Sequence, residues 1–222
     1  MLKKVIKNLI SKIHVTVHGA GTKLAGILSI NTPNYCNKQC MKNAKIEGSI
    51  CQKCYATRYL KMRKRLRDAL ERNYELLTSS ILPLNELPRF NTLYGRFESF
   101  GDLSNGIQFI NYLNICNVNP QTTFAIWTKN PHIISEVLND MGYKKPDNLI
   151  IIVSSLFINI PWKYKALPYA EKYWFIDKIF TVYDKKTIKE KNININCGAR
   201  DCMSCGLCYT KNDVKEINEE LK

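Results

Sequence analysis

The chain has no long apolar run. Its longest strongly apolar stretch extends from Leu149 to Val153, far short of the roughly 20 residues that a membrane-spanning helix needs. Near the N-terminus, apolar residues from Leu2 to Ile13 recur at helical spacing among lysines. They never form the continuous apolar core of a signal peptide. We therefore expect a short amphipathic N-terminal helix, no membrane partner and a location in the cytoplasm.

Acidic residues are scarce. The chain has 19 Asp and Glu residues against 33 Lys and Arg residues, and its formal net charge is +14. A basic surface attracts polyanions, so nucleic acid is a candidate partner. A general bias of the sequence toward Lys, Asn and Ile would also produce this charge. Both explanations stay open.

Internal repeats, low-complexity tracts and interdomain linkers are also absent. A length of 222 residues with 45% hydrophobic residues is enough for one sizeable core. We predict a single domain over residues 1–222. Within it we expect an N-terminal helix and edge strand (1–22), a core (23–192), and a cysteine-rich segment that ends in a charged helix (193–222).

Cysteines are missing from most of the chain because they are concentrated in two groups. Between the groups lies only Cys116, whose place on the apolar face of a predicted helix indicates a buried core residue. Thiolates held a few residues apart in a loop converge on one centre, as metal sites require. The eight predicted ligands are Cys36, Cys40, Cys51, Cys54, Cys197, Cys202, Cys205 and Cys208.

The spacing of the second group favours iron and sulfide over zinc. Cys202, Cys205 and Cys208 form a C-x-x-C-x-x-C run, which is typical of ferredoxin loops that bind a 4Fe-4S cluster. Structural zinc more often uses two separated C-x-x-C pairs. Disulfides are the third interpretation, but they belong to secreted chains, and nothing else in the sequence indicates secretion.

Short β-rich stretches alternate with helical ones, a pattern that predicts βα units. We expect an α/β fold, specifically an incomplete (β/α) barrel with mainly parallel strands and with cysteine-rich metal loops near both ends of the chain. Strands are expected at 23–30, 94–99, 122–127, 148–153 and 178–182, with an edge strand near 14–18. Helices are expected at 52–79, 105–116, 131–141, 185–191 and 211–222.

Polar residues follow the predicted strands in succession. Parallel sheets gather their chemistry at the carboxyl ends of their strands, so these residues are candidates for one site next to the first cysteine loop. Taken singly, each has a plainer explanation as a helix cap, a turn residue or a solvated cation. The candidates are Glu98, Ser99, Gly101, Asp102, Thr128, Lys129, Ser154, Ser155 and Asp184.

Several motifs together resemble a known family. They are the CQKCYA stretch that starts at Cys51, the RFESFGD segment, the FAIWTKN segment, and the terminal CGARDCMSCGLC. In this order they resemble the phage family called gene product eighty-eight, over about residues 24–208. No activity is established for that family. The resemblance implies a phage or other mobile element and the cytoplasm of its host cell.

A more distant resemblance is to radical S-adenosylmethionine enzymes. These have a partial barrel whose first strand is followed by three cysteines, the last often next to an aromatic residue, as in Cys54-Tyr55. The resemblance implies an open iron on a 4Fe-4S cluster that binds S-adenosylmethionine. The chain departs from the pattern, because ten residues separate Cys40 from Cys51, and residues 98–102 replace the usual Gly-Gly-Glu segment.

Under this resemblance the first cysteine group holds the reactive cluster and the second an auxiliary one. Whether three or four cysteines of the first group bind stays open. The resemblance assigns substrate or cofactor contact to Glu98, Asp102 and Lys129, and implies an electron donor and a substrate that the sequence does not identify. The further cofactor-binding candidates are Tyr55, Ser99, Gly101, Thr128 and Ser154.

The alternative belongs to another functional class. It is a non-catalytic nucleic-acid-binding protein with structural zinc or closed iron-sulfur clusters. The KMRKRLR stretch from Lys61 to Arg67 places five positive charges directly after the first cysteine loop. Such a stretch is most often a solvated helix surface, but it also suits a phosphate backbone.

Overall fold

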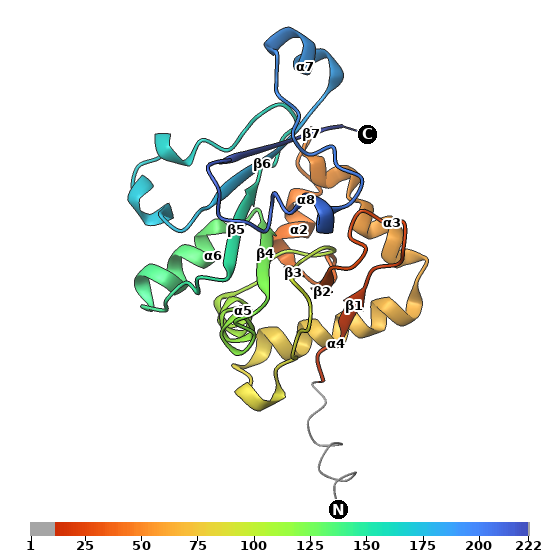
Figure 1. The fold of residues 1–222 in the computed structure, drawn as a ribbon, viewed down its shortest axis with the longest axis vertical. Helices are drawn as coiled ribbons and strands as arrows, with labels where there is room; N and C mark the ends of the chain where they lie inside the picture. The colour runs from red at the N-terminus through yellow and green to blue at the C-terminus, as the bar shows by residue number, and fades with distance from the viewer. Residues whose placement is uncertain (1–11, 222) are drawn as a thin grey trace, which may run out of the picture.

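The computed structural model describes residues 12–221, and the expected N-terminal helix lies mostly outside them. Seven strands form the centre of the molecule (Figure 1). They are β1 (Val15–Val17), β2 (Leu28–Ile30), β3 (Tyr94–Phe97), β4 (Thr123–Thr128), β5 (Leu149–Ser154), β6 (Lys178–Tyr183) and β7 (Glu216–Glu220).

The helices connect successive strands. The α-helices are α2 (Lys38–Asn43), α3 (Tyr55–Lys61), α4 (Lys64–Ser79), α5 (Gly106–Val118), α6 (Pro131–Ser135), α7 (Lys185–Lys191) and α8 (Cys202–Cys205). The shorter helices are η1 (Ile50–Lys53), η2 (Leu84–Glu86), η4 (Tyr164–Ala166) and η5 (Ala170–Tyr173), and η3 (Glu136–Asp140) is a π-helical turn that continues α6.

The sheet follows the chain order from β1 to β7 without interruption. The β1 strand pairs antiparallel to β2, and every later pair is parallel. The predicted α/β class with a mostly parallel sheet is therefore confirmed, and the edge strand expected near 14–18 is present as β1. The sheet is open between β1 and β7, so a barrel is not confirmed, and its partial closure stays a prediction.

The two faces of the sheet are covered differently. Side chains alternate between the faces along each strand, and Phe124 and Ile126 of β4 lie in the large core that α4, α5 and α6 complete. Ala125 of β4, with Ile150 and Ile152 of β5, lies on the opposite face, in a smaller core with Tyr209. There the C-terminal segment with α8 crosses the middle of the sheet (Figure 1). The second cysteine group is thus built on the sheet itself.

The helix predicted over 52–79 is divided in the structure. It consists of the end of η1, then α3 and α4, with a break at Met62 and Arg63. At the break the guanidinium of Arg63 stacks 3.6 Å from the ring centroid of Tyr59. The change of direction lets Leu70 of α4 pack with Leu60 of α3 in a small core of their own.

Two other expectations are wrong in detail. The first strand does not begin at Lys23, because residues 23–27 form turns whose backbone receives the C-terminal segment: the Cys202 amide donates to the Lys23 carbonyl at 2.8 Å. The predicted helix over 211–222 is instead strand β7 within the described residues. It pairs with β6 along five residues and buries Ile217, and this long-range pairing overrides the helical propensity of its glutamates.

No helix of residues 12–221 has both the length and the apolarity to cross a membrane.

Candidate functional site

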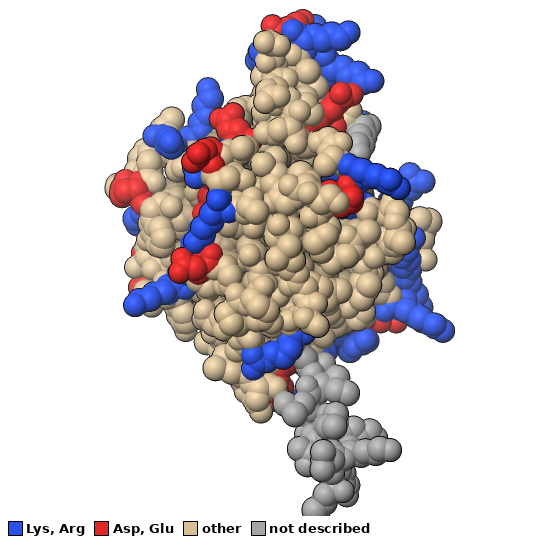
Figure 2. Space-filling model, in the orientation of Figure 1, with Lys and Arg blue, Asp and Glu red and all other residues tan. Residues whose placement is uncertain are grey.

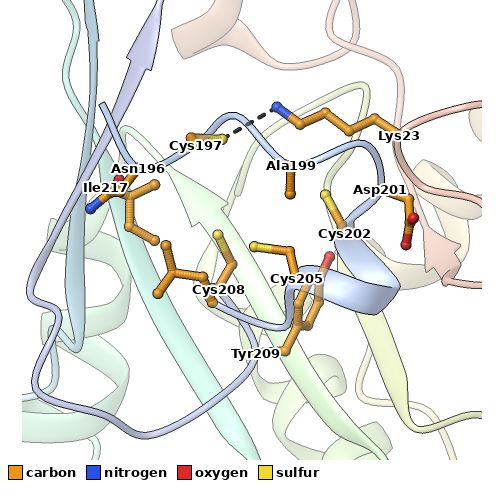
Figure 3. Close-up of a pocket in the computed structure, with 11 residues that line it drawn as sticks. Lys23, Asn196, Cys197, Ala199, Asp201, Cys202, Cys205, Cys208, Tyr209 and Ile217 are labelled. Carbon is orange, nitrogen blue, oxygen red and sulfur yellow. Dashed lines mark hydrogen bonds between the residues drawn. The ribbon is translucent and has the colours of Figure 1, made fainter. Parts of the chain in front are cut away.

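The second cysteine group converges on one hollow. Figure 3 shows the four cysteines around one space, with the sulfur of Cys197 directed at the ammonium of Lys23. The hollow, counted with its opening to solvent, has a volume of about 320 Å³. Its other lining residues include Lys23, Tyr209 and Ile217. One hollow is therefore lined by all four ligands that the spacing predicts: Cys197, Cys202, Cys205 and Cys208.

Local hydrogen bonds fix the loop around this hollow. The carboxylate of Asp201 caps α8 by accepting from the Ser204 amide at 2.7 Å. Helix α8 ends at Gly206, whose φ of 63° suits glycine. The Cys197 amide donates to Asn218 of β7 at 3.0 Å. Both ends of the cysteine segment are thus anchored, one to the 23–27 turn and one to the edge strand.

The thiols of Cys197, Cys202 and Cys208 resist ionisation. Burial raises the pKa of Cys208 to about 12, and the neighbouring Cys197 and Cys202 raise it further in the same direction. Burial and nearby sulfurs also raise the pKa of Cys197 and Cys202. Like charges so close together repel, and a bound cation removes that repulsion by pairing with each thiolate.

Lys23 lies directly against this group. Its ammonium donates to the sulfur of Cys197 at 3.3 Å and to the carboxylate of Glu219 at 2.7 Å. Burial acts to lower the pKa of Lys23, but the hydrogen bonds and charges of Glu219 and Cys197 outweigh it and raise the pKa above its ordinary value. A permanent cation therefore contacts one of the four sulfurs.

In the first cysteine group, three thiols lie within range of one another's charge. The charges of Cys51 and Cys54 both act on Cys40, and the charge of Cys54 also acts on Cys51. Burial raises the pKa of Cys40, and the nearby Asp102 adds to the rise. Cys36 differs, because the charges that act on it are those of Glu71 and Glu75 on α4. The structure thus separates Cys36 from the other three.

Asparagines hold the first loop over the ends of the strands. The buried side chain of Asn37 caps α2 by accepting from the Cys40 amide at 3.0 Å, and it donates to the Asp102 carbonyl at 2.8 Å. Asn34 donates to Thr57 at 2.7 Å and approaches the sulfur of Cys54 at 3.9 Å. Farther along, the Ile50 amide bonds to Leu156 beyond β5. The loop therefore spans the sheet edge from β2 to β5.

Glu98 points into the protein at the end of β3. It has a left-handed φ of 59° and is 3% exposed. Its carboxylate accepts from the Thr32 amide at 3.1 Å, from Gln108 at 2.7 Å and from the Tyr112 hydroxyl. Burial raises the pKa of Glu98 to about 8, although the hydrogen bonds from Tyr112 and Thr32 oppose the rise. Its carboxylate is fully engaged in the helix-side core.

Asp102 is also buried and engaged. It accepts from the Thr128 hydroxyl at 2.5 Å, from the Lys129 amide at 2.9 Å and from the Leu103 amide at 2.8 Å. Burial raises the pKa of Asp102 despite the opposing charge of Lys129. That lysine also acts on Cys51, so of the three residues assigned to catalysis, Lys129 is the one that is half-buried beside the first thiols.

The remaining cofactor-binding candidates are spread over the same edge. The Tyr55 hydroxyl donates to the Ser99 carbonyl, while the Ser99 hydroxyl is buried with no hydrogen-bond partner among residues 12–221. A Cβ on Gly101 would lie 2.5 Å from the Thr32 carbonyl, so this glycine allows a close backbone contact. Ser154 ends β5 on the face that carries Ile152. The candidates Ser155 and Asp184 make structural bonds, to Thr181 and Asn159 respectively.

A family model described as Gene product 88 matches residues 7–211. The chain belongs to the Gene product 88 family. The resemblance carried by its four motifs is thereby confirmed, and the relation to radical S-adenosylmethionine enzymes is not. No curated protein and no solved structure matched the chain.

The Gene product 88 fold also places residues in the site that the sequence motifs leave out. Arg96 of β3 stacks 3.9 Å from the ring centroid of Trp127, on the sheet face that Tyr209 covers. Its Nε atom is buried without a hydrogen-bond partner in the described part of the chain. The charge of Arg96 acts on Tyr55 near the first thiols and on Cys202 and Cys208 in the second group. The sequence signal for Arg96 is its position two residues after Tyr94, which places both side chains on the same face of the strand.

Neither group of this Gene product 88 protein is shown to bind metal. Within residues 12–221, no three His, Cys, Asp or Glu side chains are arranged as a bound metal ion would require. The nine cysteines are all free thiols, and Cys116 is fully buried in α5, as its sequence position predicts. Metal binding by the other eight stays a prediction.

Proposed function

We propose that the protein is an iron-sulfur protein with two centres. The observation that carries the proposal is the convergence of Cys197, Cys202, Cys205 and Cys208 on one hollow. Four thiolates complete the coordination of a 4Fe-4S cluster. The C-terminal centre is therefore coordinatively closed, which suits electron transfer.

The lining of the hollow suits a soft metal group, and the hollow opens to solvent. The half-buried Cys208 and its neighbours contribute sulfur and few other polar atoms. Soft thiolate donors select zinc, copper(I) and iron-sulfur clusters, and the C-x-x-C-x-x-C spacing favours the last of these.

The first centre supports a catalytic role. Cys40, Cys51 and Cys54 provide three thiolates, while Cys36 faces the carboxylates of α4. Three thiolates leave one iron of a 4Fe-4S cluster open to a small molecule, which is the chemistry of radical S-adenosylmethionine enzymes. The chain's own contribution would be the cation of Lys129 and the hydroxyls of Tyr55 and Ser99 near that position. An incomplete barrel, with its mouth at this edge, belongs to the same proposal.

The second candidate is the non-catalytic nucleic-acid-binding protein with zinc or closed clusters. The basic residues that surround the first cysteine loop favour it. The two candidate functions predict different metal contents and different responses to S-adenosylmethionine, so measurements of these two properties distinguish them.

The test is the content of iron, acid-labile sulfide and zinc in protein purified without oxygen, with Cys51→Ala and Cys205→Ala variants. We expect about eight irons per chain, since each of two clusters holds four, and loss of half in each variant. Cys116→Ala is the matched control, because that thiol is buried in α5 away from both groups. Its iron content is expected to equal that of the unchanged protein.

Stoichiometric zinc without sulfide would reject the proposal and leave the second candidate. If two clusters are found, S-adenosylmethionine is added to the reduced protein, and the electron paramagnetic resonance spectrum is recorded. A changed spectrum that is lost in Cys51→Ala and retained in Cys205→Ala would assign the open iron to the first centre.

A further inference from the structure

We propose that the surface around the first cysteine group binds single-stranded nucleic acid. We call it the basic surface, and it consists of α2, η1, α3 and the first turn of α4. This inference rests on the proposed function in one respect, since it makes nucleic acid the substrate that reaches Cys40, Cys51 and Cys54. Binding itself is independent of the cluster chemistry.

The excess positive charge is concentrated in this one segment. Residues 38–67 contain ten Lys and Arg residues and one acidic residue, Glu47, whereas the other 192 residues contain 23 against 18. A general compositional bias would spread the excess along the chain. The concentration therefore requires a local explanation, and a polyanionic partner provides one.

Most of these cations are exposed, and none takes part in an ion pair found among the described residues. Nine of the ten are exposed and Arg67 is half-buried, and the ion pairs found among residues 12–221 include none of them. Figure 2 shows basic side chains gathered along the edge of the molecule that α3 and the start of α4 form. The ten are Lys38, Lys42, Lys45, Lys53, Arg58, Lys61, Arg63, Lys64, Arg65 and Arg67.

Aromatic rings lie among the cations. Tyr55 is 60% exposed and Tyr59 is 37% exposed. The Tyr59 ring lies between Phe100, with centroids 5.1 Å apart, and the guanidinium of Arg63 at 3.6 Å, so Tyr55 is the ring available to a base. Exposed rings within a basic surface stack on bases, whose flat faces are free in single strands and hidden in duplexes. The aromatic residues therefore favour a single strand over a double helix.

The basic surface leads directly to the first thiols. Cys54 is the residue that precedes Tyr55 at the start of α3, and Cys40 lies within α2 between Lys38 and Lys42. A strand that lies along these helices passes over the three-thiol group. The substrate class that this placement selects for the first centre is a nucleotide within a single-stranded nucleic acid.

The test measures binding of fluorescently labelled single-stranded RNA and DNA, and of the matching duplexes, by anisotropy. The variant carries Arg58→Ala, Lys61→Ala and Arg65→Ala together. Its matched control carries Lys185→Ala, Lys186→Ala and Lys189→Ala on α7, which removes the same charge at a distant place. We expect the first variant to bind at least about tenfold more weakly and to lower the salt slope by about 2, since each single-strand phosphate contact contributes about 0.7. The control should stay within about twofold.

Base stacking is tested by Tyr55→Ala, because Tyr55 is the more exposed of the two rings. We expect it to weaken single-strand binding roughly tenfold or more, with circular dichroism verifying that the fold is kept. Equal weakening by the two triple variants, equal competition by polyglutamate, or tighter binding of duplex than of single strand would each overturn the proposal. A preference for RNA or for DNA identifies which of the two nucleic acids the surface binds.

Metal analysis keeps the two proposals apart. If zinc replaces iron while the triple variants behave as expected, the catalytic proposal fails and the nucleic-acid surface stands. If iron and sulfide are present but no oligonucleotide binds, this inference fails alone. The charge variants should retain the full iron content, because none of the three substituted side chains is a cysteine of either group.

Discussion

Cys36 differs from the other cysteines of the first group in its surroundings. Its neighbours are Glu71 and Glu75, and the adjacent Tyr35 donates to Glu71 at 2.6 Å. Sequence spacing alone could not identify this, because Cys36 and Cys40 form a ligand-like pair. The turn that places Cys36 against α4 is a property of the folded chain.

This separation predicts different effects for two neighbouring substitutions. Cys36→Ala should keep the full iron and sulfide content, since its sulfur lies outside the group of three. Cys40→Ala should reduce both by about half, because a cluster with two remaining thiolates is not retained. Iron and sulfide are measured in the two proteins after parallel purification without oxygen. Equal losses in both would show four ligands in the first centre.

The Lys23 ammonium predicts a shift in redox potential. A positive charge against the Cys197 sulfur stabilises the more negative, reduced form of a cluster held there. Lys23→Met should therefore lower the reduction potential of the C-terminal centre by roughly 30–60 mV, where 59 mV is a tenfold change for one electron. Redox titration followed by electron paramagnetic resonance measures it.

Glu219→Gln is the matched control, because it removes the negative partner of Lys23 and leaves the contact with Cys197. This variant should raise the potential. A fall in both variants would indicate a general disturbance of the site, and the role assigned to Lys23 would be wrong.

At the scale of elements, the sequence predicts the strands and helices of the core well and the cysteine segments poorly. Strands β3 to β6 begin and end within about two residues of the expected positions. Each contains a short apolar run, and such a run can be recognised in the local sequence. The predictions of a strand that begins at Lys23 and of a helix over 211–222 are wrong. The conformations of these two segments depend on pairing with Cys202 and with β6, and such long-range contacts leave no periodic signal in the chain.

Gly101 provides a prediction about the loop between β3 and α5. A methyl group there would lie 2.5 Å from the Thr32 carbonyl and 2.7 Å from the Glu98 carboxylate. Gly101→Ala should lower the free energy of unfolding by about 2 kcal/mol, as overpacking of a rigid site does. Urea unfolding measures the change. Gly19→Ala, where nothing lies within 4 Å of the added carbon, should change stability by less than about 0.5 kcal/mol.

At the scale of the whole molecule, the candidate residues divide between the two faces of the sheet. Their position at strand ends was predictable from the alternation of elements, but the direction of their side chains was not. Glu98 and Asp102 point into the helix-side core, whereas Arg96 and Trp127 occupy the face beneath the cysteine segment. Arg96 and Glu98 are two residues apart, so strand alternation alone would place both on one face. Glu98 follows the end of β3 with a left-handed φ that no local pattern indicates, and this conformation changes its direction.

Glu98 makes the stability of the whole molecule dependent on pH. Burial raises the pKa of its carboxyl from an ordinary 4.5 to about 8. Between these values the folded protein binds a proton that the unfolded chain has released, so stability falls as the pH rises from about 5 to 8. His14 and His18 act in the opposite direction, since burial lowers the pKa of each. The contribution of Glu98 is therefore seen only by comparison with a variant.

Glu98→Gln removes the titrating group and keeps the side chain's size. We expect the unfolding free energy of the unchanged protein, taken relative to that of the variant, to fall between pH 5 and pH 8. The expected fall is on the order of a few kcal/mol, since one pKa unit corresponds to 1.36 kcal/mol. Urea unfolding at half-unit pH steps measures the difference. Glu47→Gln, at an exposed position, is the matched control for the loss of one carboxyl group. A flat difference for Glu98→Gln would mean that the four hydrogen bonds from Thr32, Gln108 and Tyr112 keep the carboxylate ionised.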